Sequence, residues 1–581
     1  MPISSSMFRS LPVALGVALF STASVEAQAP NWDWAVSMGD SNSDYCYALA
    51  TDPSGNVYAT GYFIGTVDFD PGPSAHNMSS HGGLGIYLSK FNSVGELVWA
   101  ISFGSPGYKA GASVKTDSHG HVYLTGLFTG SIDMDPGPGI TQLTSVGSHD
   151  IFVAKFTDQG SLVWALAIGG PDHEGGSSMA IDDTANGAVY VAGSFSGPLD
   201  FDPGPGVFEM DPDSLTDAFI LKLDTAGHFV WARSLASAHL VPLRDMAVSP
   251  SGDGSVYTVG YFEGTIDMDP DLATTYTFTS VGGTDLFVNK LSAEGDLVWA
   301  KQFGGMGFEM AMAVVVDQMA PYDVYLAGNF QNTVDFDTSP AVTTLTAAGA
   351  FDAFIAKLNS SGAPIWAKGF GAHGDEYSGK LVLDPTGSGN VIACAYFNHR
   401  VDFDPAPGTE FYLTSAGGTD MYVLNLNSAG EFNYAHSAGG FAPDMALALA
   451  AAPNGDLYVG GSFFSPEIAM GNTTLTNAFD GGYTGDIFIA KLGHLDVGVE
   501  ERTAFPVSVH PNPARDRLEI TAGPELNGGL IEIFDVVGRR VLRSRWGPVV
   551  DVTSLNQGLY VLRLLKRDRC VFSKRIVIER E

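Results

Sequence analysis

The acidic phrase Asp-x-Asp recurs six times in this chain of 581 residues, and carboxylate oxygens are ligands for hard cations such as Ca²⁺. Residues two apart on a strand point to the same side, so each phrase could place two carboxylates together. The pairs are Asp68 and Asp70, Asp133 and Asp135, Asp200 and Asp202, Asp267 and Asp269, Asp335 and Asp337, and Asp402 and Asp404. Six calcium sites are one interpretation. Because calcium takes about six to eight oxygens, which no phrase supplies, we favour the alternative that Asp caps turns beside Pro and Gly.

A lysine ends a second repeated phrase, of which Asp150-Ile-Phe-Val-Ala-Lys155 is one copy. The lysines are Lys90, Lys155, Lys222, Lys290, Lys357 and Lys491, and Asn425 stands in the remaining copy. We expect each lysine to form a salt bridge with a neighbouring unit or with the aspartate set. A ring of lysines that holds an anionic ligand is the alternative, and the excess of acidic residues argues against it.

The loops that differ most between repeated units carry aromatic, histidine and glutamate side chains, as in Gly169–Gly175 and Gly304–Met310. Binding residues often lie on such loops of a rigid scaffold. The candidate ligand-binding residues are Tyr45, Tyr108, His173, Glu174, Phe308, Glu309, His373, Glu376 and Tyr377. The alternative is that these are solvated loops without a ligand.

The common catalytic motifs are absent from the sequence, which contains neither Gly-x-Ser-x-Gly nor His-Glu-x-x-His nor a phosphate-binding Gly-x-x-x-x-Gly-Lys. His119-Gly-His121 offers two metal ligands, but its spacing fixes no third. We therefore predict no catalytic residue and no cofactor other than the calcium already considered. Paired carboxylates of the glycosidase kind are compatible with so acidic a sequence, which does not single out two of them.

Internal repeats supply the elements that position these residues. Trp-Ala recurs at intervals of 65 to 68 residues, at Trp34, Trp99, Trp164, Trp231, Trp299 and Trp366, with Tyr434 in the next place. Between these anchors lie seven copies of a phrase such as Val57-Tyr-Ala-Thr-Gly-Tyr-Phe63. Each unit has four short apolar runs bounded by Gly, Asn, Asp and Pro, which indicates four strands. The runs are apolar on both faces, as in a sheet packed between two neighbours.

The phase of the repeats predicts how the ring closes. Asn31-Trp-Asp-Trp-Ala35 is a fourth-strand phrase without preceding partners, and the last unit ends at Asp486–Leu492 without its own Trp-Ala strand. Pairing the two would remove two exposed sheet edges. We therefore predict an all-β fold with a seven-bladed β-propeller over residues 30–495, closed by the N-terminal strand. An open solenoid or two smaller domains are the alternatives.

These phrases resemble the bacterial β-propeller repeats called SBBP repeats. The resemblance rests on Asp-x-x-Gly-Asn-Val-Tyr-Ala-Thr-Gly-Tyr-Phe and Gly-Glu-Leu-Val-Trp-Ala and covers most of residues 31–495. It implies a propeller fold and an extracellular setting, and no defined reaction.

The C-terminal part has a different composition. Residues 498–581 hold 14 Lys and Arg against 11 Asp and Glu, so +3 of the total charge of −35 lies there and −38 lies before it. Residues 496–504 read as a linker. The alternating short apolar runs of residues 505–581 predict a small Ig-like β-sandwich.

This segment resembles the C-terminal sorting domain of the type IX secretion system of the Bacteroidota. The residues that carry the resemblance are Pro511, Asn512, Pro513, Asp516, Gly538, Arg539, Gly558, Tyr560 and Lys574, and His510 departs from the usual residue before Pro-Asn-Pro. The resemblance implies that the secretion machinery binds residues 505–581 and delivers the protein outside the cell or to its surface. An ordinary Ig-like accessory domain, in which Pro-Asn-Pro is a rigid turn, is the alternative.

Residues 1–29 predict a secretory signal peptide, with Arg9 before a short apolar run and small residues at the cleavage site. The run is too short to span a bilayer, and we expect no transmembrane segment in the mature chain. The net charge of −35 would repel phosphate backbones, which argues against nucleic-acid binding.

Three functions follow from these observations. The favoured one is a secreted or cell-surface propeller that binds a glycan or protein, or serves in adhesion. The alternatives are a secreted polysaccharide hydrolase or lyase that uses the channel mouth, and a structural envelope protein without a specific ligand.

Overall fold

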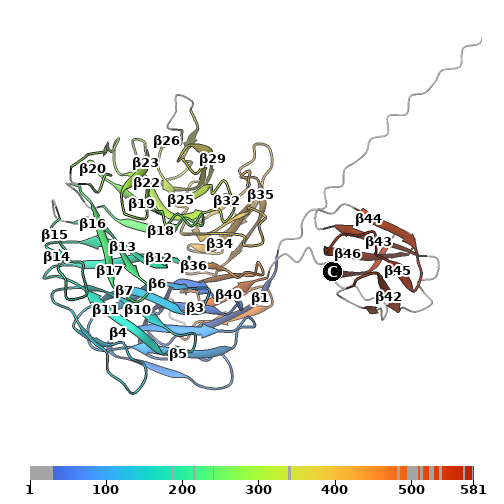
Figure 1. The fold of residues 1–581 in the computed structure, drawn as a ribbon, viewed down its shortest axis with the longest axis horizontal. Coiled ribbons are helices and arrows are strands. Elements are labelled where there is room, and N and C mark those ends of the chain that lie inside the picture. Colours follow the sequence, from blue (N-terminus) through green and yellow to red (C-terminus); the bar gives the residue numbers. More distant parts are fainter. Residues whose placement is uncertain are drawn as a thin grey trace, which may run out of the picture.

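The computed structural model describes residues 30–184, 187–212, 216–237, 239, 241–271, 273–337, 342–479, 484–493, 508–510, 514–521, 529–535, 540–566, 569–578 and 580. Within them every regular element is a β-strand, so the predicted all-β class is confirmed (Figure 1). The predicted signal peptide, residues 1–29, and the predicted linker, residues 496–504, lie outside the described residues.

Seven antiparallel sheets of four strands occupy the described part of residues 32–492. We number them in chain order, each from its first strand outward. Sheet 1 is β2 (Tyr45–Thr51), β3 (Val57–Asp68), β4 (Asn77–Phe91) and β5 (Leu97–Phe103). Sheet 2 is β6 (Lys109–Thr116), β7 (Val122–Phe128), β10 (Asp150–Phe156) and β11 (Leu162–Ile168). Sheet 3 is β12 (Glu174–Asp182), β13 (Ala188–Phe195), β16 (Asp217–Asp224) and β17 (Phe229–Leu235). Sheet 4 is β18 (Leu243–Val248), β19 (Val256–Phe262), β22 (Asp285–Leu291) and β23 (Leu297–Phe303).

The remaining three sheets continue the pattern. Sheet 5 is β24 (Met310–Val316), β25 (Val324–Phe330), β28 (Asp352–Leu358) and β29 (Pro364–Phe370). Sheet 6 is β30 (Lys380–Leu383), β31 (Val391–Phe397), β34 (Asp420–Leu426) and β35 (Phe432–Ala438). Sheet 7 is β36 (Asp444–Ala451), β37 (Leu457–Phe463), β40 (Asp486–Leu492) and β1 (Trp32–Met38).

Small hairpins extend the connection between the second and third strands of six sheets. They are β8 (Ser131–Asp133) with β9 (Gln142–Thr144), β14 (Leu199–Asp200) with β15 (Glu209–Met210), β20 (Thr265–Asp267) with β21 (Thr277–Thr279), β26 (Thr333–Asp335) with β27 (Thr344–Thr346), β32 (Arg400–Asp402) with β33 (Tyr412–Thr414), and β38 (Glu467–Met470) with β39 (Thr473–Thr476). In sheet 1 the same connection is a direct extension of β3 and β4.

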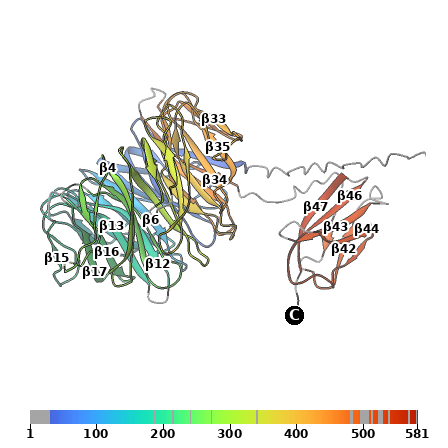
Figure 2. The ribbon, with the colours of Figure 1, turned by 90° about the horizontal axis from the view of Figure 1, so that it is seen from above.

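The N-terminal strand completes sheet 7, as the repeat phase predicted. Strand β1 pairs with β40, Trp34 opposite Lys491 and Ser37 opposite Phe488. Each first strand contacts the first strand of the next sheet, and β36 of sheet 7 contacts β2 of sheet 1. No sheet closes on itself in the described residues, and the sheets lie side by side, as Figure 2 shows. Neighbouring sheets are joined by side-chain packing and by backbone hydrogen bonds, such as the one from the Asp44 N–H to the Gly485 carbonyl. The fold is propeller-like.

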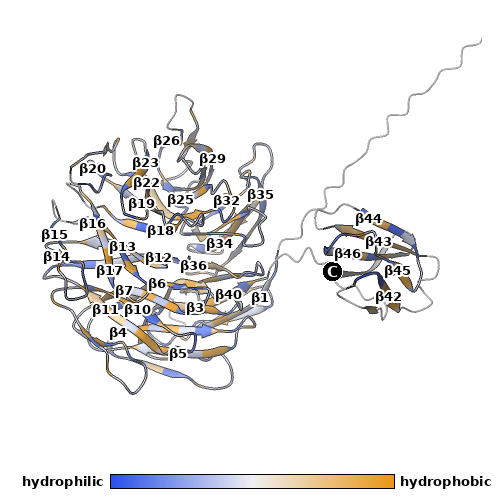
Figure 3. Cartoon of the chain, viewed as in Figure 1, coloured by the Kyte–Doolittle hydropathy of each residue, from blue (hydrophilic) through white to orange (hydrophobic). Residues whose placement is uncertain are grey.

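The runs that are apolar on both faces are explained by this stacking. In β3, Tyr58 packs with Phe103 and Val114 toward sheet 2, whereas its neighbour Ala59 packs in the core shared with Ile487 of sheet 7. All seven residues of β10 are buried. Alternate side chains therefore enter two different cores, and orange, apolar stretches occur along the strands in Figure 3.

The C-terminal region forms two antiparallel sheets. One is β41 (Ser508–His510), β42 (Arg517–Thr521) and β45 (Val549–Asp551), and the other is β44 (Arg540–Arg545), β43 (Leu530–Asp535), β46 (Gly558–Lys566) and β47 (Arg569–Ile578). Buried residues of both sheets, among them Leu518, Ile533 and Leu562, share one core.

Candidate functional site

The Asp-x-Asp phrases close the hairpin loops. In each of the six, one oxygen of the first aspartate accepts two backbone N–H groups; Asp133 Oδ1, for example, accepts those of Asp135 and Thr141, at 3.1 and 2.8 Å. The second aspartate caps the following residues in most copies, as Asp135 does for Gly137. These contacts are the turn chemistry that we favoured over calcium. Within the described ranges, no group of three or more His, Cys, Asp or Glu side chains is placed to hold a metal ion.

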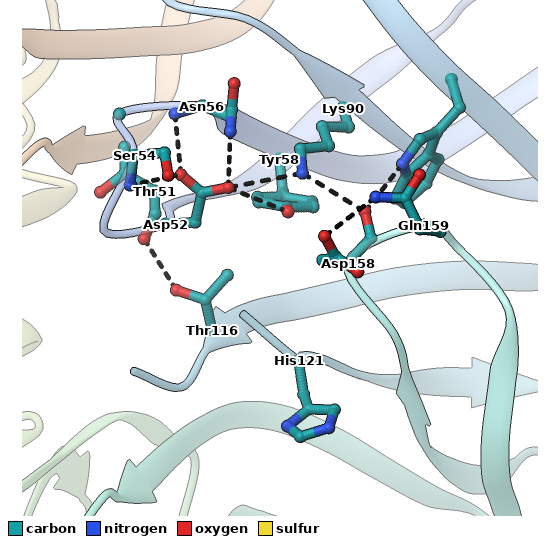
Figure 4. Close-up of polar contacts among 12 residues, drawn as sticks. Thr51, Asp52, Ser54, Asn56, Tyr58, Lys90, Thr116, His121, Asp158 and Gln159 are labelled. Atoms are coloured by element: carbon teal, nitrogen blue, oxygen red, sulfur yellow. Dashed lines mark hydrogen bonds and ion pairs between the residues drawn. The ribbon is translucent and has the colours of Figure 1, made fainter. Parts of the chain in front are cut away.

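The repeated lysines join neighbouring sheets, and Figure 4 shows the contacts of Lys90. Lys90 Nζ lies 3.4 Å from the Asp52 carboxylate and 5.0 Å from the centre of the Tyr58 ring, both in its own sheet. It also donates to the carbonyl of Asp158 in sheet 2, at 3.3 Å, and the indole N–H of Trp99 donates to that same oxygen at 3.1 Å. Two donors of sheet 1 therefore hold one turn of sheet 2.

The same junction recurs between successive sheets. The lysine and tryptophan of one sheet share a carbonyl of the next sheet in five pairs: Lys90 and Trp99, Lys155 and Trp164, Lys222 and Trp231, Lys357 and Trp366, and Lys491 and Trp34. The last pair reaches Ser93 and so joins sheet 7 to sheet 1. The predicted contact with a neighbouring unit is present, but its acceptor is a backbone carbonyl. The aspartate partners, such as Asp52 and Asp456, lie in the first turn of the same sheet and not in the Asp-x-Asp set.

The predicted ligand-binding residues lie where the first strands of the sheets begin, and we call this end of the sheets the rim. Tyr108 and Phe308 are 42% and 49% exposed, His173 and His373 are exposed, and Tyr45 and Tyr377 are half-buried. Tyr108 also lines an open groove of about 700 Å³ with Gly65, Ser80 and Gly83 of the first hairpin.

Aromatic side chains gather on the rim of sheets 1 to 3. Tyr45 lies 5.1 Å from Tyr62 and 5.7 Å from Tyr47, measured between ring centres. Burial, and to a smaller extent the nearby Tyr108 phenol, raise the pKa of Tyr47 to about 12. On its other side Tyr108 contacts His149, at 5.3 Å between ring centres.

The cluster continues through the histidines. His149 and His173 face each other with ring centres 4.5 Å apart, and their Nδ1 atoms are 2.9 Å apart. Burial, and then the nearby His173, lower the pKa of His149. We call Tyr45, Tyr47, Tyr62, Tyr108, His149 and His173 the aromatic rim. A second, smaller group combines Tyr377 with Tyr396, at 4.9 Å, and Phe351.

Three predicted rim residues are enclosed, contrary to what their loop positions implied. Glu174 and Glu309 are 0% exposed and Glu376 is 1% exposed. One oxygen of each accepts the N–H of a residue four positions earlier, as Glu309 does from Gly305 at 2.8 Å. The other oxygen of each has no hydrogen-bond partner in the described residues. Their carboxylates are therefore closed to a ligand in this structure.

Each enclosed glutamate faces a buried aspartate of the preceding sheet. Burial, and secondarily the charge of Asp150, Asp285 or Asp352, raises the pKa of the corresponding glutamate to about 7. Asp44 repeats the arrangement beside Asp486, and burial raises its pKa to about 8. A carboxyl group that titrates near neutrality has the proton affinity of a general acid or base. These carboxyl groups are buried, and each lies where two neighbouring sheets meet.

Sequence reasoning missed three charged residues on the inner strands. Lys115, Asp245 and Lys380 line the axial channel, among mostly small and apolar neighbours. It also missed Tyr47, Tyr62, Tyr396 and His149. For the three charged residues, the detectable sign was a charge at a repeat position where other units have Ala, Ser or Val.

The sorting residues are described only in part. Tyr560 is buried and its hydroxyl donates to the Asn556 carbonyl at 3.0 Å, and Asp516 lies 3.6 Å from Arg580. Gly558 begins β46 and Lys574 belongs to β47. Pro511, Asn512, Pro513, Gly538 and Arg539 lie outside the described residues.

Two curated proteins share sequence similarity with the repeat region. An uncharacterised WD repeat-containing protein, L264, of Acanthamoeba polyphaga mimivirus is 21% identical over 458 residues, which are 66% of this chain and 32% of that protein. The regulatory protein FlaEY of Caulobacter vibrioides is 25% identical over 363 residues, 58% of this chain and 34% of that protein. The chain thus spans about a third of the length of each relative.

Two solved structures illustrate the structural similarity. The WD40 β-propeller domain of Doa1 is 10% identical, with a TM-score of 0.35 over 79% of this chain and 96% of that one. PorZ, a surface component of the type IX secretion system of Porphyromonas gingivalis, is 11% identical, with a TM-score of 0.16 over 94% of this chain and all of that one. These scores are too low to support a shared function.

Two families match segments of the chain. The secretion system C-terminal sorting domain matches residues 508–579, and the β-propeller repeat named SBBP matches residues 38–62. The sorting domain indicates export and implies interaction with the type IX machinery. None of the described residues forms a helix that could cross a membrane. The chain is thus a propeller-repeat protein with a C-terminal sorting domain, secreted or attached to the outer-membrane surface.

Proposed function

We propose that this protein is a secreted or surface-attached binding scaffold whose aromatic rim holds an extracellular glycan. The observation that carries the proposal is the contiguity of Tyr45, Tyr47, Tyr62, Tyr108, His149 and His173 beside the groove at Tyr108. Tyrosine offers an apolar ring face and a polar hydroxyl, which suits the apolar faces and hydroxyl groups of sugars.

The proposal includes the organisation of the whole chain. Residues 1–29 are its signal peptide, residues 30–495 a closed seven-bladed propeller, residues 496–504 a linker and residues 505–581 an Ig-like sorting domain. The seven four-stranded sheets and the contact of β36 with β2 support the closed ring. The shared core of the two C-terminal sheets supports the sandwich.

The alternatives differ from this scaffold in one testable feature each. A polysaccharide hydrolase or lyase needs acidic groups open to the substrate, and the rim glutamates are enclosed. A structural envelope protein needs no ligand at all. We retain Phe308, His373 and Tyr377 as candidate contacts, because they lie on the same rim.

A glycan array tests the binding proposal. The exported chain, residues 30–581, should bind a subset of glycans, and Tyr108→Ala should reduce that signal at least tenfold. Tyr276→Ala, an exposed tyrosine on the hairpin of sheet 4, is the matched control and should leave it unchanged. Absence of binding to every glycan would favour the structural alternative, and release of shortened oligosaccharides would favour the hydrolase or lyase.

A truncation tests the sorting assignment. A chain that ends at Leu495 keeps the repeats but lacks the matched sorting domain. It should remain in the periplasm, whereas the full chain reaches the surface or medium. Normal surface delivery of the truncated chain would contradict the assignment.

A further inference from the structure

The axis of the ring is a channel with a cavity of about 430 Å³, lined by the first strands of all seven sheets. Most of its lining is small or apolar, for example Ala48, Ala180, Val314 and Ala448. A cavity of this size accommodates a small molecule or one end of a larger one.

Three charged side chains interrupt the repeat in this lining. Asp245 pairs with Val259 and Lys380 with Cys394, at the repeat position where the other five sheets have Ala48, Ser113, Ser178, Ala313 and Ala448. Lys115 pairs with Tyr123, and the equivalent residues are Ala50, Ala180, Ala247, Val315, Val382 and Ala450. The charges thus come from sheets 2, 4 and 6. Because five or six units fold without a charge in these places, the fold does not require one.

The aspartate is anchored, whereas the lysines are not. Asp245 Oδ1 accepts the Ser178 hydroxyl at 2.9 Å, and Oδ2 accepts the Val314 N–H at 3.1 Å. Among the described residues, neither the Lys115 nor the Lys380 ammonium group has a hydrogen bond or an ion pair. Burial lowers the pKa of Lys115, Asp245 opposes that shift, and Lys380 adds to it. The channel therefore holds two unpartnered cations in a chain of net charge −35.

Lys115 and Lys380 are half-buried in a largely apolar channel, where an ammonium group without a partner is less favourable than in water, and the repeat offers Ala or Val instead. A bound anion would satisfy both lysines, since ammonium groups act as point charges toward oxyanions. We propose that Lys115 and Lys380 form a binding site in the axial channel for an oxyanion, a carboxylate, sulfate or phosphate group, with Asp245 limiting the total negative charge that the site accepts. This site is separate from the aromatic rim and does not depend on the glycan proposal.

Two sources would supply this chemistry, a free small anion or an acidic group on a glycan. Residues 30–581 should be titrated calorimetrically at constant ionic strength with the small anions sulfate, phosphate and citrate. A second series should use the acidic glycan trigalacturonate, with neutral galactotriose as its uncharged control. We expect saturable binding of at least one anion. Binding of the small anions identifies a free anion as the ligand, whereas binding of trigalacturonate alone identifies an acidic glycan.

Substitutions decide whether the channel lysines carry this binding. Lys115→Met and Lys380→Met should each weaken affinity at least tenfold, and Asp245→Asn should strengthen it severalfold. Lys301→Met changes the same charge on the outer strand β23 and should have no effect. The two methionine variants should have melting temperatures no lower than that of the parent chain, since each loses an unpartnered charge. Lys115→Arg and Lys380→Arg keep the charge and should retain anion binding. The proposal would be overturned if no anion bound saturably, or if Lys115→Met and Lys380→Met bound the anion as tightly as the parent chain does. Glycan-array binding that is unchanged in these variants would leave the rim proposal intact.

Discussion

The two ends of the ring differ in how strictly they repeat. At the end where lysine and tryptophan meet the next sheet, five junctions share one set of donors and acceptors. At the rim, the equivalent positions hold Tyr45, Ala110, Gly175, Met310 and Tyr377. Regular contacts therefore join the sheets, and the positions that vary lie on the rim. Departures from the repeat are therefore the better guide to candidate binding residues.

Removal of β1 is expected to have the largest effect. A chain that starts after Met38 loses the fourth strand of sheet 7 and the Trp34 contact with Ser93. It also exposes β40 as an edge, which favours association with other chains. We expect a melting temperature at least 10 °C lower, or aggregation, in circular dichroism and light scattering. A chain that lacks residues 1–29 alone is the control, and equal stability of the two would contradict closure by β1.

Loss of one junction tryptophan should have an intermediate effect. In Trp99→Ala, the contact with Gly160 and the hydrogen bond to Asp158 disappear together. Because the Trp99 indole is half-buried, we expect Trp99→Ala to lower the free energy of unfolding by about 2–3 kcal/mol, measured by urea denaturation. Trp99→Phe should lose less, since it keeps a ring in the junction.

The neighbouring Val98 provides the matched control for this loss. Its side chain is 49% exposed on the same strand, and Val98→Ala should change stability by less than about 0.5 kcal/mol. A similar effect of the two alanine variants would show that the tryptophans do not join the sheets.

The regular part of the molecule was predictable from the sequence because a repeat reports the same constraint many times. The spacing of Trp34, Trp99 and Trp164 located the fourth strands, and the unpaired phrase at Trp34 predicted its pairing with the last unit. The acceptor of the lysines was not predictable, because a backbone carbonyl has no signature in the sequence. Lys90 donates to the main-chain carbonyl of Asp158, so the side chain at position 158 plays no part in this contact.

The irregular part was only partly predictable, because loop position does not determine which way a side chain points. Tyr108 is exposed as expected, whereas Glu309, one residue beyond Phe308, turns inward to cap Gly305. Lys115 and Lys380 escaped notice because a single lysine in an apolar run carries no pattern. They stand out only once the seven strands are aligned by register.

The enclosed glutamates should give the smallest effect, a stability that falls with rising pH. A raised pKa in the folded state means that the folded chain holds its proton more tightly than the unfolded chain, whose glutamates titrate near 4.5. Below about pH 4.5 the glutamates are protonated in both states, so they add no pH dependence to the free energy of unfolding. Between pH 4.5 and 7 the unfolded state ionises first, so stability is lost progressively, and above about pH 7 the loss is complete.

Glu309→Gln isolates one of these groups. The amide keeps an acceptor for the Gly305 N–H and cannot ionise beside Asp285. We expect the variant to be more stable than the parent chain at pH 8 by about 1–2 kcal/mol, and to lose that advantage at pH 4.5, in melting curves recorded across this range. Glu410→Gln, an exposed glutamate of the hairpin connection in sheet 6, is the control and should follow the parent curve. If Glu309→Gln also follows the parent curve at every pH, the carboxyl pairs do not store protons, and the rim would owe its enclosed acids to packing alone.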